Sequence, residues 1–151
     1  KYCPQAKISV LSNSTFIHRP KIHEALAKVD NNILKLDTIN AEYINKVDRP
    51  TQPSYDVNRI IADIKSFNGQ AIIQTMFMKG TTEDGYDVDN TTEAFVAPWL
   101  ETIKEIAPRE VMIYTIDRET PDQHLQKATH EELDAIRDRV IALGIPCTAS
   151  Y

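Results

Sequence analysis

Short apolar runs alternate along the chain with segments in which apolar residues recur at every third or fourth position. The runs predict five strands, and the recurring pattern predicts helices between them. Strands that alternate with single helices favour right-handed crossovers and hence a parallel sheet. We therefore expect an α/β fold with sequential strand order and helices on one side of the sheet. The predicted strands are residues 8–11, 33–36, 70–78, 110–116 and 145–151.

Capping and breaking residues mark the ends of the predicted helices. Ser54 is expected to cap the second helix, and Thr129 with Glu132 forms a capping box before the last one. Pro98 either kinks the third helix or marks its true start. Leu143 is expected to face inward at the end of the last helix. The whole arrangement corresponds to part of a TIM-like barrel, a parallel sheet with crossover helices.

The segment KLDTIN, residues 35–40, places two charges in an otherwise apolar strand. Residues two apart in a strand point to the same face, so Lys35 and Asp37 lie side by side, opposite Leu34 and Leu36. We expect the leucines to pack against the helices and the charges to face the open end of the sheet. Because that end is open to water, Asp37→Ala is expected to change the melting temperature very little. A plain ion pair is the structural alternative.

Other predicted strands also end in polar residues. Parallel sheets bind ligands at the carboxyl ends of their strands, so four polar ends on one edge favour a shared ligand site. Arg118 has two interpretations of equal weight: it is part of this ligand site, or it is a solvated loop arginine paired with Asp117 or Glu119. The polar strand ends are Asn13 after the first strand, Lys35 and Asp37 in the second, Gln74 in the third, and Asp117 with Arg118 after the fourth.

Composition narrows the class of protein. The chain has 151 residues, a net charge of −5 and a pI near 5.3, which argue against a general nucleic-acid-binding surface. No apolar run reaches the length of a membrane span. Cys3 and Cys147 match no metal or redox spacing, so a reducing, cytoplasmic location is expected. The histidines and the acidic loop at residues 83–89 lack the spacing of metal sites, and Arg49 is most simply a loop arginine.

Several segments resemble, in order and character, the later half of the barrel of radical S-adenosylmethionine (SAM) enzymes. LSNST is similar to the turn that ends the family's third strand, NILKLD to its fourth strand, AIIQTMFMKG to its fifth and VMIYTIDRETP to its sixth. KLD followed by DRPT and IIQTMF is the most specific combination. The similarity covers most of residues 7–118 and is closest to iron–sulfur oxidoreductases grouped with glycyl-radical activating enzymes and tRNA wybutosine synthases.

The resemblance implies a radical SAM oxidoreductase, such as an activating enzyme of the pyruvate formate-lyase type, that generates a 5′-deoxyadenosyl radical for hydrogen abstraction. It implies SAM as the cofactor and a [4Fe–4S] cluster in the parent protein. The family's Cys-x3-Cys-x2-Cys loop and Gly-Gly-Glu motif are absent from this chain. We therefore expect residues 1–151 to be a single domain, the C-terminal fragment of a longer barrel, inactive alone and with weak SAM affinity.

Residue roles follow from the same resemblance. Around the ribose and the methionyl group it places Asn13, Lys35, Asp37 and Gln74, and beside adenine it places Ile116. Arg118 is expected to face the substrate. No catalytic residue and no metal ligand is expected within the chain itself.

The substrate and the partner remain open at this stage. A protein glycyl-radical enzyme is one candidate, and tRNA is another that the net charge disfavours. No membrane partner is expected, and exposed sheet edges favour self-association of the fragment. Two other classes compete: a receiver-like signalling domain phosphorylated on Asp37, although the first strand ends in SNST without the required acidic pair, and a non-catalytic small-molecule-binding α/β module.

Overall fold

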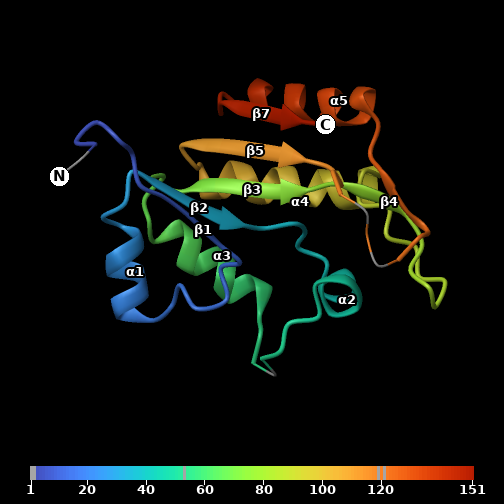
Figure 1. Cartoon of the computed structure of the whole chain (residues 1–151), viewed down its shortest axis with the longest axis horizontal. Helices are drawn as coiled ribbons and strands as arrows, with labels where there is room; N and C mark the ends of the chain where they lie inside the picture. The colour runs from blue at the N-terminus through green and yellow to red at the C-terminus, as the bar shows by residue number, and fades with distance from the viewer. Residues whose placement is uncertain (1–2, 53, 119, 121) are drawn as a thin grey trace.

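Five strands form one parallel sheet in the computed structural model, which describes residues 3–52, 54–118, 120 and 122–151. The strands follow one another in sequence order across the sheet (Figure 1). The sequential parallel sheet expected from the sequence is therefore confirmed. The strands, from one edge to the other, are β1 (Ser9–Ser12), β2 (Asn31–Lys35), β3 (Ile72–Met76), β5 (Glu110–Tyr114) and β7 (Cys147–Ser150).

Four helices cover one face of this sheet. Their buried side chains share a single apolar core with the strand residues Leu34, Ile73 and Ile113, each no more than 1% exposed. Helix α3 lies beside α4, and α4 lies beside α5. This one-sided layer confirms the partial-barrel expectation and does not fit a doubly wound receiver domain, which carries helices on both faces. The helices are α1 (Pro20–Leu26), α3 (Val57–Lys65), α4 (Glu93–Ile106) and α5 (His130–Ala142).

The two-residue period of the strands separates the core from the opposite face of the sheet. Leu34 and Leu36 are buried in the same core as Leu26 of α1 and Ile60 of α3, as the sequence predicted. Lys35 and Asp37 alternate with these leucines and therefore point to the other face. On that face of the edge strand β1, Leu11 is 60% exposed.

A second, antiparallel sheet extends β3 beyond the main sheet. Strand β4 (Met78–Gly80) pairs with β6 (Leu125–Lys127), where the sequence predicted loops apart from Met78, the last residue of the third predicted strand. Gly80 has φ +98°, and a Cβ atom there would lie 2.1 Å from the backbone oxygen of His124, so the tight pairing requires glycine. The sequence pattern missed this sheet because each of its strands has only three residues.

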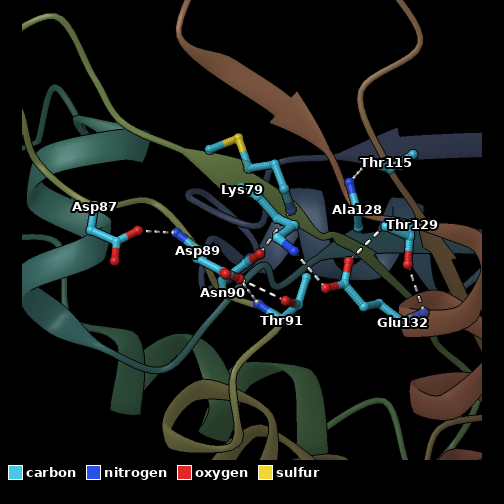
Figure 2. Close-up of polar contacts among 10 residues, drawn as sticks. Lys79, Asp87, Asp89, Asn90, Thr91, Thr115, Ala128, Thr129 and Glu132 are labelled. Atoms are coloured by element: carbon cyan, nitrogen blue, oxygen red, sulfur yellow. Dashed lines mark hydrogen bonds and ion pairs between the residues drawn. The ribbon is translucent and has the colours of Figure 1, made fainter.

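Side-chain hydrogen bonds attach the small sheet to the rest of the molecule (Figure 2). The Asn90 side-chain amide bridges the end of β3 and the start of β4. It accepts from Met78 N at 2.8 Å and donates to Met76 O at 2.9 Å. Lys79 Nζ lies 2.6 Å from Glu132 Oε1. Glu132 also belongs to the capping box of α5, so this ion pair links β4 to the start of that helix.

Three predicted helix ends need comment. The capping box of Thr129 and Glu132 is confirmed. Ser54 is not the cap of α3: Asp56 directly precedes the helix, and its carboxylate accepts from the backbone N–H of Asn58 at 2.9 Å. Leu143 is not inward, since it is the C-cap residue of α5 and is 37% exposed beyond the last residue that faces the sheet.

Pro98 lies inside α4, which begins at Glu93, so the alternative that Pro98 marks the start of this helix is wrong. Proline lacks the N–H that would bond to the preceding turn. The long apolar face of the helix, including Val96, Trp99 and Ile103, is buried on both sides of the proline and compensates for the missing bond.

Asn32 is the one member of the helix-facing side of β2 that is not apolar. Its side chain is 4% exposed, and neither amide atom has a hydrogen-bond partner among the described residues. An unpaired buried amide costs about 1–3 kcal/mol. The substitution Asn32→Leu is therefore expected to raise the free energy of unfolding by about that amount, and the melting temperature by roughly 2–4 °C per kcal/mol. Calorimetric melting measures it.

The neighbouring Asn31 provides a matched control. Its side chain donates to Ser9 Oγ and accepts from Arg109 Nη2, both at 2.8 Å. Asn31→Leu removes two satisfied hydrogen bonds and is expected to lower the melting temperature. Equal losses from the two substitutions would show that the Asn32 amide is hydrogen-bonded in solution, for example to a buried water molecule.

Candidate functional site

A cavity of about 320 Å³ lies at the carboxyl ends of β1 and β2. We call it the strand-edge cavity. Three residues that the sequence assigned to one ligand site come together in its wall: Asn13, Lys35 and Asp37. The remaining wall comes from the loop after β1 and from the segment between β2 and α3, namely Thr15, Phe16, Leu36, Thr38, Asp48, Arg49, Pro50, Thr51 and Tyr55.

Lys35 and Asp37 form an ion pair in the cavity wall. Lys35 Nζ lies 3.1 Å from Asp37 Oδ2, and the two side chains are 32% and 7% exposed. The other carboxylate oxygen, Oδ1, accepts from the backbone N–H of Met76 at 2.8 Å. Asp37 thus ties the end of β2 to β3, and Lys35 is the more exposed member of the pair in the cavity wall.

Burial and mutual attraction act in opposite directions on this pair. Burial raises the pKa of the Asp37 carboxyl above its usual range, although Lys35 and the Met76 N–H oppose that effect. Burial alone lowers the pKa of the Lys35 ammonium, but Asp37 and the phenol of Tyr114 outweigh it and raise the pKa. Lys35 therefore carries its positive charge at neutral pH.

The cavity wall also includes Asp48, which the sequence did not single out, and Arg49, which was interpreted as a loop arginine. After β2 the chain forms a short helix, α2 (Ala41–Tyr43), which continues into a π-helix, η1 (Ile44–Asp48). Asn40 caps α2, because its side chain accepts from Tyr43 N at 2.9 Å. Arg49 ends the π-helix in the left-handed conformation, with φ 46° and its N–H bonded to Ile44 O at 2.9 Å. This turn brings Asp48 and Arg49 into the cavity wall.

Asp48 is a second acidic group of the cavity wall with a raised pKa. Partial desolvation at the cavity wall, together with the negative charge of Asp37, raises the pKa of Asp48 from 3.8 to about 7, against the opposing effect of Lys35. The pKa of the Tyr55 phenol is raised to about 12, mainly by burial and then by the negative charges of Asp48 and Asp37. The sequence signal for this region is weak: the Asn40 cap precedes only three α-helical residues.

The other predicted site residues lie elsewhere. Gln74 is the register partner of Lys35 on β3, so it flanks the cavity without lining it. Ile116 packs against the apolar cluster of Tyr43, Met78 and Val88. Arg118 is exposed and does not line the cavity. Of its two proposed partners, Asp117 lies 3.9 Å from Lys127 instead, and Glu119 is outside the described residues.

Metal-binding groups are scarce in the described part of the chain. No set of three or more His, Cys, Asp or Glu side chains there is placed to hold a metal ion. Cys3 is exposed, and burial raises the pKa of the Cys147 thiol to about 12, which keeps that thiol protonated at neutral pH. Among the helices of the described residues, none combines the length and the apolarity needed to cross a membrane.

Curated proteins similar to this chain are longer than it is. It is 30% identical over 116 residues to a UPF0026 protein of Helicobacter pylori strain J99, an alignment that covers 74% of this chain and 34% of the relative. The corresponding protein of strain 26695 is 29% identical with the same coverage. The chain thus spans about a third of the length of these relatives. No protein-family model matches it.

Three solved structures share the architecture over nearly the whole chain. A radical SAM methyltransferase from Sphaerobacter thermophilus superposes with a TM-score of 0.69 at 17% identity, over 95% of this chain and 40% of that one. Streptococcus suis SuiB bound to SAM gives 0.67 at 13% identity, over 96% and 33%. The fold is that of the radical SAM enzymes. A domain of pyruvate-formate lyase-activating enzyme from Bacteroides vulgatus gives 0.62 at 13% identity, over 91% and 78%.

The radical SAM fold confirms, at the level of architecture, the resemblance inferred from the strand-end motifs. In this fold the carboxyl edge of a parallel sheet is the place where ligands bind. The strand-edge cavity lies at that edge, and all of its named polar residues come from strand ends or from the segments that follow them.

The burial of Asp37 corrects the expectation that its site is open to water. Asp37→Ala removes the acceptor of the Met76 N–H and leaves Lys35 unpaired, so it is expected to lower the free energy of unfolding by about 1–3 kcal/mol. Asp37→Asn keeps an oxygen for Met76 and is expected to cost less than half as much. Urea unfolding compares the two. An unchanged transition in Asp37→Ala would restore the original expectation.

The raised pKa of Asp48 predicts a pH dependence of stability. The native state holds a proton that the unfolded state releases between pH 3.8 and about 7, so this group stabilises the fold least at high pH. Its contribution falls as the pH rises through that window and is lost above about pH 7. Asp48→Asn should therefore flatten the fall in melting temperature between pH 4 and 7. An unchanged slope in the variant would contradict the assignment.

Proposed function

We propose that this chain forms the C-terminal half of the barrel of a radical SAM oxidoreductase and supplies part of the SAM-binding wall. The observation that carries the proposal is the meeting of Asn13 and Lys35, from neighbouring strand ends, in one cavity of a radical SAM fold. The whole parent would act as an enzyme, in the cytoplasm, and the isolated chain would be inactive.

The polar groups of the strand-edge cavity suit SAM. Its methionyl carboxylate is an anion, and the Lys35 ammonium and the Arg49 guanidinium are the cations in the wall. Its ribose hydroxyls would donate to the Asp48 carboxylate or bond to the Asn13 amide. Asp37 is occupied by Lys35 and Met76, so in this proposal it orients Lys35 and touches the ribose only through its remaining lone pairs.

Two further residues have proposed contacts next to these. Gln74, beside Lys35 in the register of the sheet, would face the methionyl group. The backbone of Ile116 would flank adenine. Arg118 would meet the substrate, because it follows the strand β5 and is exposed.

When bound to a [4Fe–4S] cluster and reduced, SAM supplies a 5′-deoxyadenosyl radical that abstracts hydrogen from a substrate. The described residues provide no set of ligands for such a cluster. The curated relatives are about three times as long as the matching region, so the proposal assigns the cluster to a part of the parent outside this chain. The role of these residues is to bind and orient the cofactor and to exclude water around it.

An activating enzyme for a glycyl-radical protein is the most specific form of the proposal. The supporting observation is the likeness to the pyruvate-formate lyase-activating enzyme domain, of which this chain covers 78%. The substrate would then be a glycine residue of a partner protein. A non-catalytic small-molecule-binding module is the alternative that the same cavity supports.

The test uses the encoded protein that contains these residues, purified without oxygen and reconstituted with iron and sulfide. On reduction it is expected to convert SAM to methionine and 5′-deoxyadenosine, measured by chromatography. Lys35→Gln removes a charge-assisted bond and should raise the SAM concentration at half-maximal rate by about tenfold. Lys35→Arg should retain most of the affinity.

Lys127→Gln is the matched control, because Lys127 is an exposed lysine of β6 that lies outside the cavity. Melting curves establish that each variant is folded. A protein that carries the cluster by its absorption spectrum and yet cleaves no SAM would overturn the radical proposal. An unchanged half-maximal concentration in folded Lys35→Gln would overturn the role of Lys35.

A further inference from the structure

A second cavity adjoins the strand-edge cavity, and its charges differ in sign from those of the molecule as a whole. This second cavity, which we call the arginine cavity, measures about 380 Å³. Three basic side chains line it: His18, Arg19 and Arg59. The chain carries a net charge of −5, so this concentration of basic side chains is local. The other lining residues are Thr15, Gln52, Ser54, Tyr55, Asp56 and Ile60.

The two guanidinium groups are held in place without strong acidic partners. Arg19 lies over the ring of Phe16, with Cζ 4.2 Å from the ring centroid, and no carboxylate of the described residues lies within 4.0 Å of it. Arg59 Nε lies 3.9 Å from Asp63 Oδ2, beyond hydrogen-bond distance. Its two terminal nitrogens therefore keep their donors available among the described residues.

One acidic side chain lies in the wall of the arginine cavity. Asp56 caps α3, and its Oδ1 accepts from Asn58 N at 2.9 Å. Its charge offsets one guanidinium, which leaves the second arginine and the imidazole of His18. The positive end of the nine-residue helix α3 lies at the same wall and adds to the attraction for an anion.

We infer that the arginine cavity binds the phosphate group of a phosphate monoester. A carboxylate presents two oxygens and a single charge, whereas a phosphate monoester presents three oxygens and a charge of about −1.5 to −2 at neutral pH, which matches two arginines from different elements. The hydroxyls of Thr15, Ser54 and Tyr55 supply further donors. Arginine is the residue best suited to this geometry.

The position of the cavity indicates what the rest of the ligand does. Thr15 and Tyr55 line both cavities, so the arginine cavity and the strand-edge cavity share a wall. The organic part of the ester extends past these two residues toward the strand-edge cavity. This step rests on the proposed function in its general form, and it names phosphorylated small molecules, in place of a protein glycine, as the class of substrate that would lie beside bound SAM. The phosphate contact itself does not depend on SAM.

Titration calorimetry of the 151-residue chain tests the inference, with glycerol 3-phosphate, inorganic phosphate and chloride at matched ionic strength. We expect saturable binding of the ester, weaker binding of inorganic phosphate and none of chloride. Arg19→Gln and Arg59→Gln should each weaken ester binding by about tenfold. Arg109→Gln, the same change at the amino-terminal edge of the sheet, should have no effect.

Each other result overturns part of the inference. Equal weakening by Arg109→Gln would show a general attraction of anions to the surface. If inorganic phosphate binds as tightly as the ester, the organic part of the ester makes no contact, and the inferred extension toward the strand-edge cavity is wrong. No saturable binding to the folded wild-type chain, judged by its melting curve, would remove the site. If the parent protein binds the ester but does not cleave SAM, the proposed function is wrong and the phosphate site stands.

Discussion

The carboxylate of Asp37 acts as a backbone acceptor beyond the end of β2, and the arrangement of the carboxyl edge depends on it. Leu36 N donates to Gln74 O at 3.0 Å, Thr75 Oγ1 donates to Leu36 O at 2.8 Å, and Met76 N donates to Asp37 Oδ1 at 2.8 Å. These three bonds keep the chain alongside β3 for two residues past the strand. The strand alternation therefore continues, with Leu36 in the core and Asp37 on the opposite face.

The same carboxylate sets the electrostatics of the cavity. Its charge holds Lys35 at the wall and helps to raise the pKa of Asp48 to about 7. The Lys35 ammonium and the Asp48 carboxyl thus face one small cavity. Asp37 attracts the ammonium and repels the ionised form of Asp48, which favours the protonated form of that carboxyl. Structural and functional interpretations of the Lys35–Asp37 pair are compatible, since Asp37 is mostly structural and Lys35 is partly exposed.

The sequence predicted what depends on periodicity and missed what depends on single contacts. Five strands, four helices and the orientation of KLDTIN follow from apolar spacing over many residues. The three-residue strands β4 and β6 depend instead on Gly80 and on the Asn90 bridge, whose partners are far apart in sequence. The strand-end residues Asn13 and Lys35 were predicted to lie together, and both line the strand-edge cavity. Arg49 was interpreted as a loop arginine, because the π-helix that places it at the cavity wall has no periodic sequence pattern.

In the proposed function, the segment between β2 and α3 would decide which ligand is bound. Lys35 is the last residue of β2, and Asn13 directly follows β1, so the sheet fixes the backbone positions of both. Asp48, Arg49 and Tyr55 come from the connecting segment, and Tyr55 also borders the arginine cavity. Since loops can vary while a sheet is conserved in shape, the general ability to bind would reside in the strands. The choice between ligands would reside in the connecting segment, whose Tyr55 lines both cavities.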